Sequence, residues 1–153
     1  MAGAIICLMG EMMSEQNKRV VLKFIQALGS SDPDTAASCL APDAVTVSKG
    51  FSKLAGSHSY ETMIGMIGAF KEILPTGLRP TIYSVTAEGH RVVVEYEGNA
   101  ITSQGKPYCN QYCMVFTLSD GKIRQINEYF CTKLADEVLY PVVAAGLGQA
   151  PRG

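Results

Sequence analysis

The sequence predicts an α+β domain in which helices pack on one face of a curved antiparallel sheet. Apolar residues recur at helical spacing through the first half of the chain. Residues 78–130 are instead rich in strand-forming residues, separated by short turns that contain glycine. Helices followed by strands, rather than alternating with them, favour this class over a parallel α/β sheet. The length of 153 residues suits one domain.

The charge distribution argues against nucleic acid or a membrane surface as a partner. The formal net charge is −1, the sequence pI is about 6.1, and the basic residues are scattered. Hydrophobic residues make up 47% of the chain and charged residues only 18%. This composition indicates either a large core or a core that includes an apolar cavity and a subunit interface.

The five cysteines do not form a recognisable framework. Their odd number and irregular spacing argue against structural disulfides, so we expect a reducing, cytoplasmic location. Cys109 and Cys113 are four residues apart, which on a strand is roughly 13 Å, too far for two ligands of one metal ion. We expect neither a metal nor an organic cofactor.

The chain order begins with an apolar segment, residues 1–13. It is too short for a membrane span and lacks the basic start of a signal peptide, so we expect a disordered extension. Residues 14–145 should form the domain and residues 146–153 a C-terminal tail. Ser14 is the expected N-cap of the first helix. The apolar face of that helix is Val21, Phe24, Ile25 and Leu28.

Two more helices are expected before the strands. Asp32-Pro33 begins a short helix, which Pro42 ends. Residues 44–47 form a short strand, followed by an irregular loop over residues 49–57. Ser59 then caps a third helix that runs to about Leu74. Its apolar face is Met63, Met66, Ile67, Phe70, Ile73 and Leu74.

The stretch from Asn110 to Thr132 is expected to be a hairpin that carries the site. Tyr112, Met114 and Phe116 alternate with the period of a strand, and Asp120-Gly121 supplies the turn. A bulge would exchange the inward set, so either Asn110/Tyr112/Met114 or Cys109/Gln111/Cys113 faces inward. In the second strand Glu128 lies among Ile126, Tyr129 and Phe130. Residues 133–145 form a closing helix or an extended arm.

This order of elements resembles the nuclear transport factor 2-like superfamily, and within it the SnoaL-like, ketosteroid-isomerase-related proteins. The matching stretches are residues 24–28, 40–45, 110–113 and 120–123, with Glu128-Tyr129. The resemblance implies a cone-shaped barrel with an apolar pocket at its mouth, the three N-terminal helices on the concave face of the sheet, and a homodimer.

The family's known catalytic sets are largely missing. In ketosteroid isomerases a carboxylate base would fall near Ser48, and the two oxyanion-binding residues near Phe24 and Cys113. The aspartate–arginine–aspartate set of limonene-epoxide-hydrolase-like enzymes would fall near Tyr96, Gly98 and Glu128. Neither mechanism is therefore expected. The acid/base carboxylate of SnoaL-like cyclases also aligns with Glu128, and here the position is filled.

Glu128 is the candidate catalytic residue. Its pKa should rise in an apolar cavity, toward the range useful for moving a proton near neutral pH. The alternative is a buried carboxylate satisfied by Tyr96, Tyr129 or a backbone N–H. The residues expected to line the pocket are Tyr96, Tyr112, Phe24, Cys113, His58, Met66, Phe70, Ile126 and Phe130.

The sequence thus predicts a cofactor-free cyclase or isomerase acting on an apolar carbonyl compound through Glu128. The alternative is a non-catalytic pocket or structural homodimer of the same fold. The absence of the isomerase residues at Phe24, Ser48 and Cys113 is the main support for that alternative.

Overall fold

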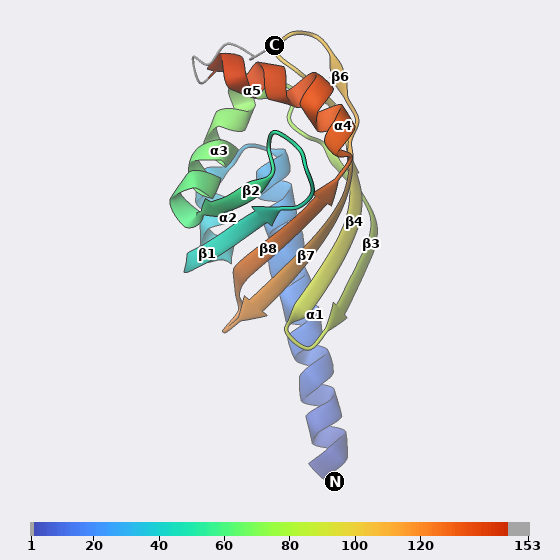
Figure 1. The fold of residues 1–153 in the computed structure, drawn as a ribbon. Helices are drawn as coiled ribbons and strands as arrows, with labels where there is room; N and C mark the ends of the chain where they lie inside the picture. Colours follow the sequence, from blue (N-terminus) through green and yellow to red (C-terminus); the bar gives the residue numbers. More distant parts are fainter. Residues whose placement is uncertain (1, 147–153) are drawn as a thin grey trace.

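A six-stranded sheet organises the molecule, which is a computed structural model describing residues 2–146 (Figure 1). Its order is β2-β1-β8-β7-β4-β3. Neighbouring strands are antiparallel except for β1 and β8, which run parallel. The strands are β1 (Leu40–Ser48), β2 (Gly56–Ser59), β3 (Pro80–Glu88), β4 (Arg91–Gly98), β7 (Gln111–Ser119) and β8 (Lys122–Phe130). A separate small hairpin pairs β5 (Ala100–Ile101) with β6 (Pro107–Tyr108).

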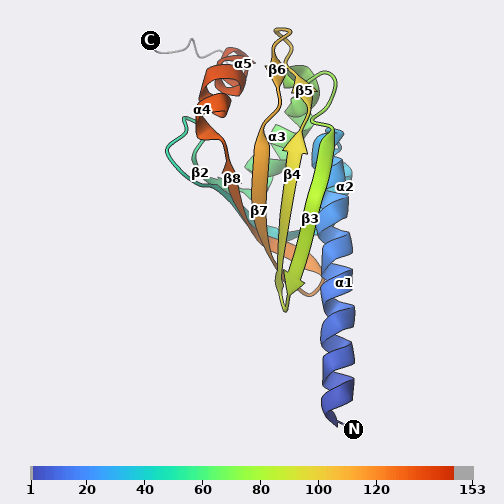
Figure 2. The same cartoon turned by 90° about the vertical axis from the view of Figure 1, so that its right-hand side faces the viewer.

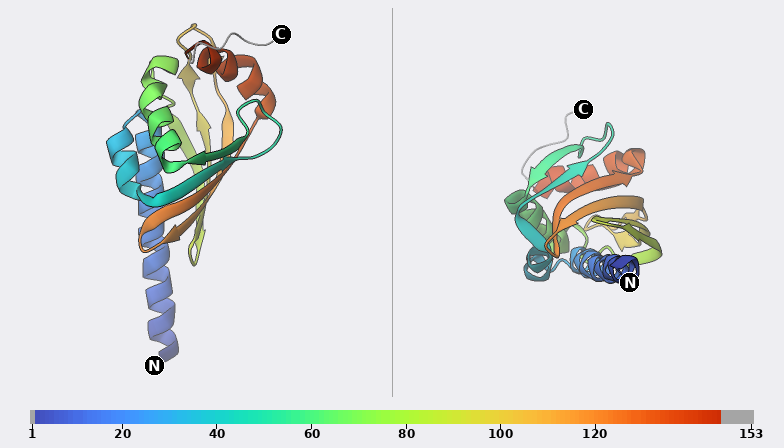
Figure 3. Two further views of the ribbon diagram at one scale, coloured as in Figure 1. Left: turned by 60° about the vertical axis from the view of Figure 1, so that its left-hand side comes forward. Right: turned by 90° about the horizontal axis from the view of Figure 1, so that it is seen from below.

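Three N-terminal helices pack on the concave side of the sheet. They are α1 (Ala2–Gly29), α2 (Pro33–Cys39) and α3 (Tyr60–Ile73). After β8 the chain forms α4 (Thr132–Leu134), the π-helical turn η1 (Ala135–Leu139) and α5 (Tyr140–Gly146). The end-on view in Figure 3 shows the strands curving around the space that these helices close. The α+β fold with a curved sheet is therefore confirmed, and the closing segment is helical.

The first helix begins much earlier than the sequence analysis placed it. We expected an extension over residues 1–13 and a cap at Ser14, but the helix is continuous from Ala2. Alanine, leucine and methionine favour helix, and no proline interrupts them, so the backbone has no reason to stop at Ser14. Figures 1 and 2 show this part of α1 projecting away from the sheet. The expected tail, residues 146–153, lies outside the described residues except for Gly146, which ends α5.

The next two helices begin where the sequence placed them. Asp32 accepts the N–H of Thr35 at the start of α2, and the Ser59 hydroxyl accepts the N–H of Thr62 at the start of α3. Two strand predictions were wrong. The strand expected over residues 44–47 extends over all of Leu40–Ser48, and the end of the expected loop belongs to β2, which pairs with β1.

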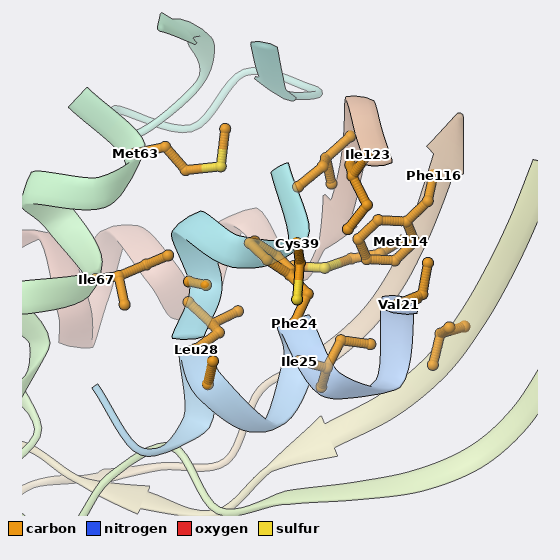
Figure 4. Packing of buried hydrophobic residues seen from close by; sticks show 14 of the residues in the cluster. Val21, Phe24, Ile25, Leu28, Cys39, Met63, Ile67, Met114, Phe116 and Ile123 are labelled. Atoms are coloured by element: carbon orange, nitrogen blue, oxygen red, sulfur yellow. The ribbon is translucent and has the colours of Figure 1, made fainter. Parts of the chain in front are cut away.

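The hydrophobic core lies between α1 and the sheet (Figure 4). Phe24 of α1 is 2% exposed and meets Phe116 of β7 edge to face, with 6.0 Å between the ring centroids. The other core side chains of α1 are Val21, Ile25 and Leu28, as the helical spacing predicted. Among the described residues, no helix combines the length and the apolar character needed to cross a membrane.

Candidate functional site

A cavity lies beside this core, toward the end of the sheet that α5 covers. The space open to the centre of a water molecule is about 90 Å³. Its walls come from α1, α3, β1, β4, β6, β7, β8, η1 and α5, and most of them are apolar. The polar side chains on the wall are Ser48, Tyr96, Tyr108, Tyr112 and Glu128. The described part of the chain therefore places one carboxyl side chain, Glu128, on this wall.

Glu128 lies on the inward face of β8. In the sheet register it sits between Ser48 of β1 and Met114 of β7. The Ser48 hydroxyl donates a hydrogen bond of 2.8 Å to Glu128 Oε2. The parallel pairing of β1 with β8 brings these two side chains together, although they are 80 residues apart in the sequence.

The surroundings of Glu128 favour its neutral form. Burial raises the pKa of this carboxyl above its usual range, while the hydrogen bond from Ser48 and the charge of His58 partly offset that rise. Thr46, two residues before Ser48, lowers this pKa least of all the neighbours. It is 5% exposed, and its hydroxyl has no hydrogen-bond partner among residues 2–146. A carboxyl with a raised pKa is a stronger base once ionised, and it stays protonated to higher pH.

Three tyrosines form the aromatic part of the wall. Tyr96 of β4 and Tyr112 of β7 stack, with ring centroids 4.8 Å apart and an angle of 12° between the ring planes. The Tyr96 hydroxyl donates to Met114 Sδ at 3.5 Å, not to Glu128. Burial raises the pKa of Tyr96, of Tyr108 and of Tyr112, and Glu128, when it is ionised, raises all three further. These hydroxyls therefore remain protonated hydrogen-bond donors.

Asn110 holds this aromatic wall to the rest of the fold. Its side chain is fully buried between β6, β7 and the end of β8. Asn110 Oδ1 accepts the backbone N–H groups of Gln111 and Cys131, at 2.8 and 3.2 Å. Its Nδ2 donates to the Tyr108 hydroxyl at 2.9 Å and to the Cys131 carbonyl at 3.2 Å. All its polar atoms are thus used within the protein.

Six of the ten residues expected at the site lie on the cavity wall. The inward set of β7 is Tyr112 and Met114, so the alternative with Cys109, Gln111 and Cys113 inward is excluded. The six are Glu128, Tyr96, Tyr112, Met66, Phe70 and Phe130.

The other four residues lie elsewhere. Phe24 and Ile126 are packed in the core beside the cavity, with 2% and 0% exposure. Cys113 faces the opposite side of the sheet, where its register partners are Glu95 and Tyr129, because alternation along β7 turns it away from Tyr112. His58 lies on β2 and affects Glu128 only through its charge.

Several wall residues were not expected from the sequence. Ser48 was noted only as a position where a carboxylate is missing. Tyr108 lies in a two-residue strand without a periodic pattern, so no local signal marked it. Leu139 and Val143 come from the closing helical segment, and the apolar spacing of that segment could have suggested an inward face.

The arrangement has no donor set for a metal ion in the described residues. Nowhere in residues 2–146 do three His, Cys, Asp or Glu side chains lie close enough to share one metal ion.

The packing around Gly98, one of the positions of the epoxide-hydrolase set, leaves no room for a side chain. A Cβ added there would lie 2.5 Å from Leu78 Cδ1. The chemistry available at the wall is hydrogen bonding by hydroxyls and proton transfer by one carboxyl.

Fold and site together define a cone-shaped α+β protein with an apolar, tyrosine-lined cavity. The family model of the SnoaL-like domain matches residues 21–126. The chain therefore belongs to the SnoaL-like domain family, within the nuclear transport factor 2-like superfamily. No protein of curated function shows detectable similarity in sequence.

Solved structures share the fold at low sequence identity. Bal32a, from a soil-derived mobile gene cassette, is 23% identical, with a TM-score of 0.73 over 82% of this chain and 98% of its own. A limonene-epoxide-hydrolase-like epoxide hydrolase of M. tuberculosis is 21% identical, with a TM-score of 0.67 over 90% and 99%. TerC, co-crystallised with polyporic acid, is 21% identical, with a TM-score of 0.69 over 82% and 98%. At these identities the likeness establishes the fold alone.

Proposed function

We propose that this protein binds a small, mostly apolar carbonyl compound in its cavity and moves a proton on it with Glu128. The reaction class is isomerisation or aldol-type cyclisation. The observation that carries the proposal is a lone carboxyl, with a raised pKa, on the wall of an otherwise uncharged cavity.

The chemistry follows from the two protonation states of one group. Ionised Glu128 takes a proton from a carbon next to the carbonyl group, which leaves an enolate and a neutral Glu128. Glu128 then returns the proton to another atom of the same molecule, so the carboxylate is regenerated. Ser48 holds one carboxylate oxygen by its 2.8 Å hydrogen bond, which fixes the direction of the other. This cycle consumes no cofactor and no second substrate.

The test compares the turnover of two Glu→Gln variants, one at the candidate site and one at a control position. A ligand that co-purifies with the protein, found by native mass spectrometry, identifies the compounds to assay. Glu128→Gln should lower turnover by about 10²- to 10⁴-fold, the usual contribution of a general acid/base. Glu72→Gln, an exposed position near the end of α3, is the matched control and should keep its rate. Full turnover by Glu128→Gln would refute the proposal.

A non-catalytic pocket is the second candidate. It is favoured by the absence of a second acid, an arginine or a histidine on the cavity wall among the described residues. If the co-purifying ligand is returned unchanged by wild-type protein and Glu128→Gln binds it equally well, this candidate replaces the first.

A homodimer in the cytoplasm completes the proposal. The convex face of the sheet supports it, because half-buried Val93 and Val115 and exposed Tyr129 belong to this face. Figure 2 shows no helix over β4, β7 and β8 on this side. Light scattering should give twice the chain mass for wild type and the chain mass for Tyr129→Glu. The five free cysteines are consistent with a reducing compartment, which cell fractionation would test.

A further inference from the structure

The hydroxyl groups of Tyr108 and Tyr112 form a hydrogen-bonded pair in which one hydroxyl proton has no acceptor in the described residues. The two residues lie on β6 and β7, and both line the cavity. Their oxygens are 3.2 Å apart, with Tyr112 donating to Tyr108. Tyr108 is 1% exposed, so bulk water does not complete its hydrogen bonds.

The direction of the hydrogen bonds is fixed by the backbone. Asn110 Oδ1 faces two N–H groups, of Gln111 and Cys131, which can only donate. The amide nitrogen must therefore face Tyr108, and the Tyr108 oxygen must accept from it at 2.9 Å. A reversed amide would place N–H against N–H at two backbone positions.

Counting the two tyrosine hydroxyl protons shows which of them has no acceptor. Two phenol hydroxyls carry two protons, and one of these fills the contact between the two oxygens. Asn110 cannot take the other, because it is itself the donor to Tyr108. With Tyr112 donating, both acceptor positions of Tyr108 are filled and the Tyr108 proton has no acceptor in residues 2–146.

We propose that Tyr108 is the ligand-orienting residue of this cavity, donating its hydroxyl proton to a carbonyl oxygen of the bound molecule. The inference rests on the proposed function in so far as the cavity must bind a small molecule. It assigns an oxygen-binding position that differs from Phe24 and Cys113, the places implied by the resemblance, neither of which lies on the wall.

The wall beside the hydroxyl pair is aromatic. Tyr96 stacks on Tyr112, with ring centroids 4.8 Å apart, and the Phe130 ring centroid lies 6.1 Å from that of Tyr112. A small aromatic ketone suits such surroundings and carries one carbonyl oxygen for a hydroxyl donor, so it is a suitable probe.

A pair of matched probes tests this assignment. Acetophenone and α-methylstyrene have nearly the same shape, but the first carries C=O where the second carries C=CH₂. Affinities for both are measured by NMR titration of wild type, Tyr108→Phe, Tyr112→Phe and Tyr83→Phe. The ratio of the two affinities cancels the general effect of burying a ring.

The expected result separates the two hydroxyls. The preference for acetophenone should fall roughly three- to tenfold in Tyr108→Phe, the size of one neutral hydrogen bond. In Tyr112→Phe the Tyr108 proton is still available, so the preference should persist. Tyr83, 64% exposed on β3, is the surface control and should leave the ratio unchanged.

Wild-type protein gives an independent measurement if Tyr108→Phe does not fold. The carbonyl ¹³C resonance of bound acetophenone should lie downfield of its position in cyclohexane, as expected for a carbonyl that accepts a hydrogen bond. A resonance at the cyclohexane position overturns the proposal. The proposal is also overturned if wild type prefers acetophenone over α-methylstyrene no more than Tyr108→Phe does. The same holds if only Tyr112→Phe loses this preference, or if neither probe binds.

These outcomes are distinct from a failure of the proposed function. The probe experiment measures binding alone and requires no proton transfer by Glu128. Full turnover in Glu128→Gln would refute the acid/base proposal but not the orienting role of Tyr108. An unchanged affinity ratio in Tyr108→Phe would refute the orienting role but not the acid/base proposal.

Discussion

The two ends of the space between helices and sheet differ sharply, although the same strands build both. At the closed end Phe116 of β7 is fully buried against Phe24 of α1 (Figure 4), and Ile126 of β8 is fully buried in the same core. One or two pleats further along the same inward faces, Tyr112 and Glu128 border a cavity of about 90 Å³. Alternation along a strand therefore decides which side a residue faces, and position along the strand decides whether it packs or borders space.

This difference separates the densely packed apolar part of the fold from the part that holds polar side chains. The closed end supplies dense packing and contains no polar side chain on its inward strand positions 116, 123 and 126. The open end places a carboxyl and three phenols in mostly apolar surroundings, which costs stability, raises the pKa of Glu128 and leaves the Tyr108 hydroxyl proton without an acceptor in residues 2–146.

The largest expected effect is on the packing of the closed end. Phe116→Ala should lower the free energy of unfolding by about 3–5 kcal/mol, because the cavity it leaves has no means to close. Phe130→Ala should cost only about 1–2 kcal/mol, since this ring is half-buried beside space that already exists. Urea denaturation measures both, and equal losses would contradict the distinction between the two ends.

The next effect concerns the attachment of the aromatic wall. Asn110→Ala removes hydrogen bonds to two backbone N–H groups, one backbone carbonyl and one hydroxyl. We expect a loss of about 2–4 kcal/mol, because buried partners are left unpaired. Asn127→Ala, on the outer face of β8, is the control and should stay within about 0.5 kcal/mol. A loss below 1 kcal/mol at Asn110 would show that the wall is held otherwise.

Glu128→Gln tests the cost of the half-buried carboxyl on the cavity wall. The pKa of Glu128 is raised in the folded state, so its stability contribution is full below the unfolded pKa of about 4.3 and is lost as pH rises through the folded pKa. Glu128→Gln should remove this loss and be more stable than wild type at neutral pH, by about 1.4 kcal/mol for each unit of pKa elevation. Thermal denaturation from pH 4 to 8 measures it, and identical pH profiles would contradict burial.

The smallest effects are on the pKa of Glu128 itself. Ser48→Ala removes the hydrogen bond to Oε2, and His58→Gln removes a nearby charge, so each should raise this pKa. His90→Gln, in the exposed β3–β4 turn, is the control. Titration of the side-chain carboxyl ¹³C resonance gives the value. A pKa that falls in Ser48→Ala would mean that the hydroxyl does not favour the ionised form.

Local patterns predicted much of this molecule. The helical faces of α1 and α3, the start of α2 at Asp32-Pro33, the cap at Ser59 and the alternation of β7 are properties of short segments, and the structure contains them. The start of α1 was wrong because a good capping residue at Ser14 does not end a segment that is already helical. β2 was missed because its four polar residues carry no apolar alternation and form a strand only by pairing with β1.

The sequence by itself determined the α+β fold and the helical surfaces that cover the sheet, since these follow from periods of 2 and 3.6 residues. Only the tertiary structure decided that Ser48 meets Glu128, that Cys113 faces outward, and that Asn110 fixes the hydroxyl of Tyr108. Those facts depend on strand register and on side-chain volumes contributed by distant elements, and no local period contains that information.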